Sequence, residues 1–428
     1  MQPTHPLPIT PGEHRRILVY SHDAYGLGNI SRMLAICNYL LKQISNLSIL
    51  LVSGSPMLHD FRLPQGLDYI KLPCLNRGTG QMAVKYLNAD MESILNLRSE
   101  IILAAAKNYQ PDLVLVDKKP TGIQGELQPT VEYLESNLPT TKLVLLLRDI
   151  LDTPEKTIAE WHTQNYYRQV ELLYDRILVV GMPEIFDLVR EYRFSSYLAN
   201  KVRYCGYIRK ESGLKNCHTI RHELGIGRDE KLVLVTPGGG EDGYSLITNY
   251  LQGLAQQKDN FTEQNINTLI FCGAQMPLQH QQQIYEQAKG LPGVTIKEFT
   301  NDMMSYINTA DLVVSMCGYN TITEVLQKGK KALVVPRIKP GREQLIRAQS
   351  MAKAGLIEMI HPEELTPNLL IETVFNSLTS AESPAKPVRI DFLGLPRVAD
   401  YLSMLMYLSM LMFDSFNIPR LPVNMRSA

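Results

Sequence analysis

The 428-residue sequence has no long apolar run, no closely paired cysteines and no excess of either charge sign. No stretch reaches the roughly 18 apolar residues that a membrane-spanning helix needs, and residues 1–16 contain no apolar core of a signal peptide. The six cysteines include no C-x-x-C pair, and several lie inside apolar runs, as buried free thiols do in the cytoplasm. Because 43 basic and 43 acidic residues cancel, no long-range field attracts a nucleic acid. These absences favour a globular cytoplasmic protein without a nucleic-acid partner.

The sequence does have a regular alternation of short apolar runs and segments with helical periodicity. In the first half the apolar runs are residues 16–21, 47–53, 113–117, 142–147, 176–180 and 201–205. In the second half they are residues 231–236, 268–272, 294–298, 311–315 and 331–335. Because these Val, Ile and Leu runs do not alternate with polar residues, they predict strands covered on both faces. Strands that alternate with helices predict an α/β fold with parallel, doubly wound sheets.

The alternation restarts after a polar stretch, which predicts two Rossmann-like domains that face each other across a cleft. We place the first domain at residues 1–208, a linker with a short helix at 209–230, the second domain at 231–395 and a C-terminal helix and tail at 396–428. The tail repeats Tyr-Leu-Ser-Met-Leu-Met at residues 401–406 and 407–412. This repeat is too short to span a membrane, so we expect a helix that packs back across the domains.

The first candidate site follows the first predicted strand, at residues 21–32. A G-x-G sequence ends here at Gly28, but Ser31 replaces the third glycine of a dinucleotide-binding loop and no acidic residue ends the second strand. A nicotinamide or flavin site is therefore disfavoured. His22 and Asp23 nevertheless lie at the carboxyl end of a predicted parallel strand, where α/β proteins bind ligands. The alternative is a plain turn with an exposed histidine.

Two loops of the second half are suited to an anion. Residues 238–240 are three consecutive glycines, whose backbone a ligand can approach closely. Gly318 follows the fourth strand of this half and precedes a helix that we expect Asn320 or Thr321 to cap. Glu324, one turn into this helix, is placed to accept hydrogen bonds from the vicinal hydroxyls of a ribose. The alternative for Glu324 is compensation of the helix dipole, which needs no ligand.

A further loop, residues 336–342, follows the last strand of the second half and leads into a helix. Arg342, Glu343 and Gln344 stand at the first turn of this helix. Polar side chains that both donate and accept hydrogen bonds suit the hydroxyls of a sugar. We therefore expect this turn to face the ligand.

Taken in order, these motifs resemble the MurG-like family 28 glycosyltransferases over about residues 231–358. The shared pattern comprises Glu298-Phe299-Thr300, Ala310-Asp311-Leu312, Ser315-x-x-Gly318-x-x-Thr321-x-x-Glu324 and Arg342-x-Gln344. The resemblance implies a GT-B fold, in which the second domain binds a UDP-sugar and the first binds the acceptor. It further implies an inverting displacement without a metal ion, with the UDP-sugar as co-substrate and no other cofactor.

The resemblance also implies the residues of the site, with Phe299 and Thr300 at the uracil and Glu324 at the ribose of the donor. Donor-binding residues would be Gly239, Gly240, Phe299, Thr300, Gly318, Asn320, Thr321, Glu324, Arg342 and Gln344. Acceptor-binding residues would be Gly28, Asn29, Asp117, Lys118, Arg148 and Asp149. The family usually has a histidine as the base where this chain has Asn29, and an asparagine cannot take a proton. We therefore predict His22 as the base, with Asp23 to orient it.

These inferences predict a glycosyltransferase that moves a sugar from a UDP-sugar to a hydroxyl acceptor, in the cytoplasm or at the inner membrane surface through peripheral contact. Two alternatives stay open. A sugar-nucleotide epimerase of the same fold would need no acceptor, and a catalytically impaired nucleotide-sugar-binding protein would be consistent with Asn29. An oxidoreductase is the least favoured function.

Overall fold

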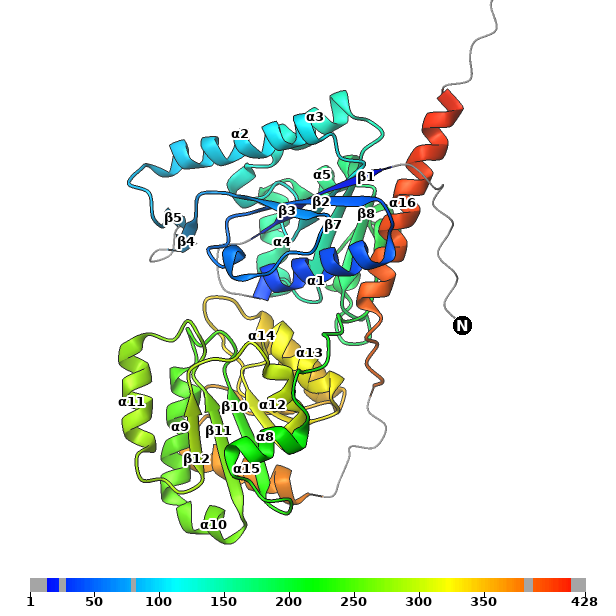
Figure 1. Ribbon diagram of the computed structural model, residues 1–428. Helices are drawn as coiled ribbons and strands as arrows, with labels where there is room; N and C mark the ends of the chain where they lie inside the picture. The colour runs from blue at the N-terminus through cyan, green and yellow to red at the C-terminus, as the bar shows by residue number, and fades with distance from the viewer. Residues whose placement is uncertain (1–13, 23–27, 78–81, 381–387, 417–428) are drawn as a thin grey trace, which may run out of the picture.

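The computed structural model describes residues 14–22, 28–77, 82–380 and 388–416, which form two α/β domains and a C-terminal helix (Figure 1). Each domain has a parallel sheet between two layers of helices, as the alternating apolar runs predict. The GT-B architecture expected from the sequence is confirmed.

The sheet of the first domain has seven parallel strands within the described residues. Across the sheet their order is β3 (Leu67–Lys71), β2 (Leu47–Ser53), β1 (Arg15–Ser21), β6 (Leu113–Asp117), β7 (Lys142–Arg148), β8 (Arg176–Val180) and β9 (Val202–Tyr204). A separate hairpin pairs β4 (Leu75–Arg77) with β5 (Met82–Val84). The strand order reverses between β1 and β6, and at such a point the loops after the two strands diverge and leave room for a ligand.

The sheet of the second domain has six parallel strands in the part of the chain that the structure describes. Their order is β12 (Val294–Lys297), β11 (Ile266–Phe271), β10 (Lys231–Thr236), β13 (Leu312–Ser315), β14 (Lys331–Val334) and β15 (Glu358–Met359). The reversal lies between β10 and β13, so the loops after these two strands are adjacent. The sequence did not predict the short edge strands β3 and β15.

Helices cover both faces of each sheet. Their bounds are α1 (Gly28–Gln43), α2 (Met91–Tyr109), α3 (Gln128–Asn137), α4 (Pro154–Thr163), α5 (Tyr166–Leu173), α6 (Leu188–Glu191), α7 (Ser196–Lys201), α8 (Cys217–Leu224), α9 (Tyr244–Gln256), α10 (Lys258–Glu263), α11 (Leu278–Ala288), α12 (Met303–Thr309), α13 (Tyr319–Gln327), α14 (Glu343–Lys353), α15 (Pro367–Thr379) and α16 (Gly394–Phe416). In the first domain α1 lies on one face of the sheet, and α2 and α3 lie on the other (Figure 1). Residues 153–174, whose periodicity predicts a single helix, form two helices instead, because Asn165 has a left-handed backbone (φ 56°) between α4 and α5.

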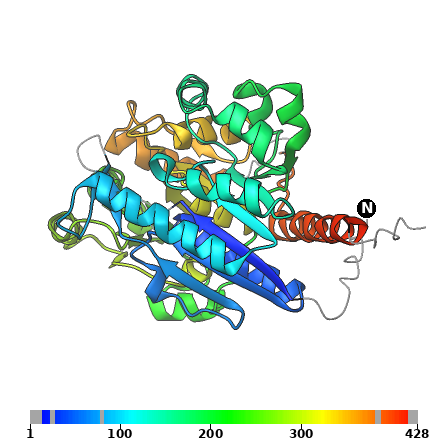
Figure 2. The same cartoon turned by 90° about the horizontal axis from the view of Figure 1, so that it is seen from above.

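The chain crosses between the domains twice. The linker carries α8, which packs on α12 of the second domain, and α16 returns to pack on α1 of the first. Leu402, Leu405 and Met406, in the first copy of the repeated hexapeptide, are buried in that contact. Beyond this contact α16 extends past the edge of the first domain (Figure 2). None of the helices in the described segments is both long enough and apolar enough to cross a membrane.

Candidate active site

The carboxyl ends of the two sheets face each other and are joined by a buried ion pair. Arg347 of α14 donates two hydrogen bonds of 2.8 Å to the carboxylate of Asp149, which directly follows β7. Arg347 is 0% and Asp149 1% exposed, so the charges neutralise each other in the interior. On the neighbouring strand β8, the carbonyl of Val180 accepts a 2.9 Å hydrogen bond from the hydroxyl of Tyr319 in α13. The loops of both domains are therefore held against one another.

A second buried ion pair lies in the first domain. Arg32 of α1 donates a 2.7 Å hydrogen bond to Asp117, the last residue of β6, and Asp117 is 0% exposed. Asp117 and Asp149 were expected to contact the acceptor. In the structure both carboxylates are buried in ion pairs that fix the ends of β6 and β7, and their contact with an acceptor stays a prediction.

Basic side chains gather at the carboxyl ends of three adjacent strands of the first domain. His22 follows β1, Lys118 follows β6 and Arg148 ends β7. Burial and the charges of Arg148 and Lys119 lower the pKa of Lys118 to about 7. Burial together with Lys118, Lys119 and Arg148 lowers the pKa of His22 well below its usual value, so the imidazole is neutral at pH 7.

Two of these basic groups, Lys118 and Arg148, form no ion pair with a carboxylate of the described residues. Among the described residues, the Lys118 ammonium forms no ion pair or hydrogen bond, and no hydrogen bond reaches Nε of Arg148. The carboxylates that partly offset the lowered pKa of Arg148 are Glu343 and Asp149. Both are already paired, Glu343 with Arg337 and Asp149 with Arg347. This edge of the first domain is therefore suited to an anion.

The other predicted residues of this edge are only partly described. His22 is half-buried, and Asp23 lies outside the described residues. Gly28 and Asn29 begin α1, at the switch point beside β6. The roles of these residues in catalysis and acceptor binding stay predictions.

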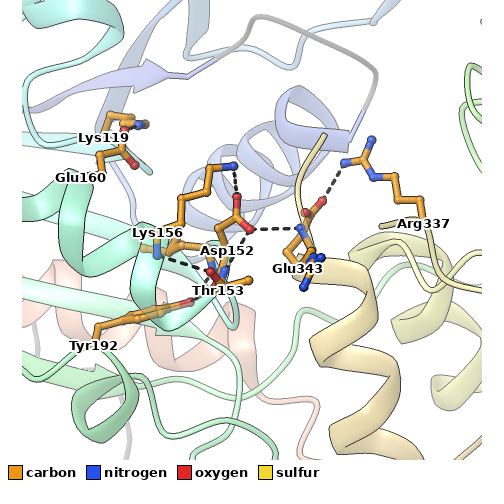
Figure 3. Close-up of polar contacts among 10 residues, drawn as sticks. Lys119, Asp152, Thr153, Lys156, Glu160, Tyr192, Arg337 and Glu343 are labelled. Atoms are coloured by element: carbon orange, nitrogen blue, oxygen red, sulfur yellow. Dashed lines mark hydrogen bonds and ion pairs between the residues drawn. The ribbon is translucent and has the colours of Figure 1, made fainter. Parts of the chain in front are cut away.

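The start of α14 presents the predicted sugar-binding turn to the first domain. The backbone N–H of Arg342 donates to Asp152 of the first domain (3.0 Å). Glu343 accepts a hydrogen bond from Arg337 (2.7 Å), as Figure 3 shows. Burial alone would raise the pKa of Glu343, but Arg337 and Arg148 lower it to about 2, so its carboxylate is ionised. The side-chain oxygen of Gln344 accepts from the backbone N–H of Arg337 (3.2 Å).

The two glycine-containing loops of the second domain lie together at the switch point between β10 and β13. A side chain at Gly238 would reach Thr321, and one at Gly240 (φ 98°) would come within 2.4 Å of the carbonyl of Cys272. Only glycine fits this conformation without strain. Helix α13 begins two to three residues earlier than expected: Gly318, and neither Asn320 nor Thr321, is its N-cap. Because Asn320 and Thr321 stand in its first turn, their backbone N–H groups are among those that no carbonyl of the helix accepts.

The predicted nucleoside-binding residues have contrasting environments. Phe299, after β12, is 51% exposed, and the hydroxyl of Thr300 accepts a 3.0 Å hydrogen bond from the backbone N–H of Asp302. Glu324 is only 5% exposed, and its carboxylate is bound by the ammonium of Lys210 from the linker. The predicted ribose contact suggested an unpaired carboxylate, but Glu324 is paired with Lys210. Its role toward a ribose stays a prediction.

Three residues that shape this region have no role among the predicted site residues: Arg32, Arg347 and Lys210. Arg347 stands one turn after Glu343 on α14, a spacing that places both on one helix face. That spacing was the available signal, but it does not name the partner, which is 198 residues away. Among the described residues, no group of three or more His, Cys, Asp or Glu side chains could hold a metal ion.

Comparison with known proteins identifies the second domain. Residues 233–391 match the glycosyltransferase family 28 C-terminal domain. The second domain belongs to this family. The MurG-like resemblance of the sequence is thereby confirmed, and the two glycine loops, Glu324 and the start of α14 all lie inside the family 28 domain.

Curated relatives match a little over a third of the chain. A UDP-N-acetylglucosamine--N-acetylmuramyl-(pentapeptide) pyrophosphoryl-undecaprenol N-acetylglucosamine transferase of Corynebacterium glutamicum (strain R) is 29% identical over 158 residues, 37% of this chain and 40% of the relative. The transferase of the same name from Haemophilus influenzae (strain PittEE) is 27% identical over 149 residues, 35% of this chain and 40% of the relative. The chain thus spans about two fifths of the length of the curated relatives it matches.

Solved structures resemble nearly the whole chain. Acinetobacter baumannii MurG has a TM-score of 0.56 at 16% identity and covers 91% of this chain and 99% of its own. A UDP-glucosyltransferase from Polygonum tinctorium has a TM-score of 0.61 at 11% identity, with 92% and 99% covered. A UDP-N-acetylglucosamine 2-epimerase has a TM-score of 0.56 at 12% identity, with 97% and 100% covered. At these identities the likeness shows the fold alone, which transferases and an epimerase share.

Proposed function

We propose that the protein is a glycosyltransferase that moves a sugar from a UDP-sugar to a hydroxyl acceptor between its two domains. The observation that carries this proposal is the family 28 domain at residues 233–391, which contains every predicted donor-binding residue. The curated relatives that match part of this chain are transferases whose names specify a UDP-linked sugar as donor.

In the proposed reaction the acceptor oxygen attacks the anomeric carbon of the sugar. The new carbon–oxygen bond forms as the bond to the diphosphate breaks, and UDP leaves with both electrons of that bond. Backbone N–H groups at the start of α13 and in the loop at residues 238–240 stabilise the departing diphosphate. Metal-independent inversion is part of this proposal.

The proton of the acceptor hydroxyl passes to a base on the first domain. We assign this role to His22, whose imidazole is held neutral by burial and by the neighbouring cations. A neutral imidazole can accept a proton, whereas an imidazolium cannot. Inverting transfer needs a single base of this kind.

We further propose that the acceptor carries a phosphate or diphosphate group. Lys118 and Arg148 offer positive charge that the described carboxylates leave unpaired. The acceptor named for the curated relatives also carries a pyrophosphoryl group. Action in the cytoplasm or at the inner membrane surface stays a prediction.

Thermal unfolding in the presence of nucleotides tests the donor site. A ligand present at about 100 times its dissociation constant adds ~2.7 kcal/mol to the free energy of unfolding. We expect UDP to raise the melting temperature and GDP, CMP and NADH to have little effect. Stabilisation by NADH in place of UDP would contradict the proposal.

An assay without acceptor separates transfer from epimerisation. A transferase leaves the sugar of the UDP-sugar unchanged or hydrolyses the donor slowly, whereas an epimerase converts it into an isomer. Isomerised UDP-sugar in this assay would overturn the transferase proposal. Stabilisation by UDP with neither transfer nor slow hydrolysis would indicate a binding protein.

A further inference from the structure

The linker between the domains packs against the part of the predicted donor site that would bind the nucleoside. Leu214 donates a backbone hydrogen bond of 3.0 Å to Asp302, and Lys215 donates one of 2.9 Å to Ser305. Gly213 lies so close that a side chain there would come within 2.2 Å of the hydroxyl of Ser305. Asp302 in turn donates to Thr300. The linker therefore lies against the loop that is predicted to hold the base of the nucleotide.

Lys210, also in the linker, contacts helix α13. The side-chain amide of Gln327 accepts from the backbone N–H of Lys210 (2.9 Å) and donates to its carbonyl (2.8 Å). These two hydrogen bonds fix the backbone of Lys210 beside the helix. Its ammonium then reaches Glu324, one turn earlier on the same helix face.

The two partners of this ion pair differ in burial. The side chain of Glu324 is 6% exposed, whereas that of Lys210 is 36% exposed. A buried carboxylate without a hydrogen-bond donor is costly, so Glu324 requires a partner when no nucleotide is bound. Lys210 supplies that partner, and its side chain is itself in contact with solvent.

We propose that Lys210 occupies the Glu324 carboxylate in place of the ribose hydroxyls, so that a bound nucleotide displaces an internal cation. This inference rests on the proposed function. Only the side chain of Lys210 has to move, because Gln327 holds its backbone independently of the ion pair. Lys210 thereby lowers the affinity for nucleotides that have a vicinal diol, and it sets how strongly the site prefers them over nucleotides that lack one.

Titration calorimetry with UDP and 2′,3′-dideoxy-UDP tests this competition on the full chain. In Lys210→Met the competitor is gone, and the hydroxyls of UDP satisfy a carboxylate that otherwise lacks a partner. We expect UDP to bind about three- to tenfold more tightly, which corresponds to ~0.6–1.4 kcal/mol. The dideoxy nucleotide cannot replace Lys210 on Glu324, so its affinity should stay unchanged.

Lys215→Met is the matched control, because Lys215 lies in the same linker but pairs with Glu223. It should change neither affinity. Lys210→Gln, which keeps a hydrogen-bond donor without the charge, provides a second variant if Lys210→Met does not fold. It should bind UDP with an affinity between those of the wild type and Lys210→Met.

The outcomes separate this inference from the proposed function. Weaker or unchanged UDP binding by both Lys210 variants would overturn the competition, while UDP binding by the wild type still supports the donor site. If the wild type and every variant failed to bind UDP, the proposed function itself would be wrong. An equal gain for UDP and dideoxy-UDP would also overturn the inference, because the gain would not depend on the ribose hydroxyls.

Discussion

Lys118 has a backbone conformation and a pKa that differ from those of an ordinary surface lysine. Its backbone is left-handed (φ 69°), a conformation that is strained for a side chain with a Cβ. Burial and its cationic neighbours lower its pKa to about 7. Strain and a shifted pKa at the end of a parallel strand point together to a ligand contact.

The pH dependence of acceptor binding checks this role. Lys118 is protonated below about pH 7 and loses its charge as the pH rises through that value. We therefore expect the KM for a phosphate-bearing acceptor to rise between about pH 6 and pH 8.5. In Lys118→Met the KM should be higher and nearly independent of pH, whereas the KM for the donor should follow the wild type. A wild-type KM that does not change over this range would contradict the assignment.

A second prediction at the residue scale concerns the base. Removing a general base typically costs about 10²–10⁴-fold in rate, so His22→Ala should lower kcat by that order. Its affinity for UDP, measured by calorimetry, should not change, because His22 belongs to the first domain. Since the pKa of His22 lies well below 6.5, kcat of the wild type should fall only at acidic pH, as the imidazole becomes protonated. Full activity of His22→Ala would place the base elsewhere, with Asp23 the next candidate.

At the scale of elements, the donor site depends on two adjacent strand-to-helix loops. β10 and β13 are neighbours in the sheet, which brings the glycines after β10 beside the first turn of α13. Gly238 and Gly240 have positive φ, and a Cβ on Gly240 would overlap the backbone of Cys272 and Gly273. Glycine at these positions leaves the backbone of the loop open to close approach by a ligand.

Substitution of these glycines measures how much the loop contributes. Gly240→Ala requires both a strained backbone and a shift of the neighbouring loop. We expect it to weaken UDP binding more than tenfold in calorimetry. Gly290→Ala is the matched control, because Gly290 has a similar φ of 81° but open space around it. It should leave UDP binding intact, and equal losses in the two variants would mean that the effect is not local to the donor site.

At the scale of the whole molecule, a buried ion pair is one of the contacts that join the two domains. Arg347 and Asp149 are buried at the junction, and Arg347 also donates to the carbonyl of Cys317 (3.1 Å). Two guanidinium groups also lie near the ring of Tyr319, that of Arg32 at 6.0 Å and that of Arg347 at 5.7 Å from its centre. Residues of both domains therefore share one polar core.

Removing one partner of this pair should cost more than removing both. Asp149→Asn leaves Arg347 buried without a counter-charge, and breaking a buried pair in this way costs ~3–5 kcal/mol. We expect a correspondingly lower free energy of unfolding by chemical denaturation. Asp149→Leu combined with Arg347→Met should be less destabilised than either single substitution. A double variant whose loss equals the sum of the single losses would show that the two residues do not act together.

The sequence by itself determined the architecture. A strand of uninterrupted Val, Ile and Leu residues can bury its side chains only when both of its faces are covered. The main strands of both sheets were therefore predictable, as were the second-domain motifs that follow them. Short edge strands such as β3 and β15 were not, because few buried residues mark them. The break at Asn165 was missed because the helical periodicity continues on both sides of it.

Only the tertiary structure decided which charges meet. Asp149 and Arg347 are 198 residues apart, Arg32 and Asp117 are 85 apart, and Lys210 and Glu324 are 114 apart. A carboxylate in a sequence motif looks the same whether it faces a ligand or a buried arginine. Its role depends on burial and on the partner that folding brings to it, because an ionised group taken out of water has to be paired with another charge or with hydrogen-bond donors.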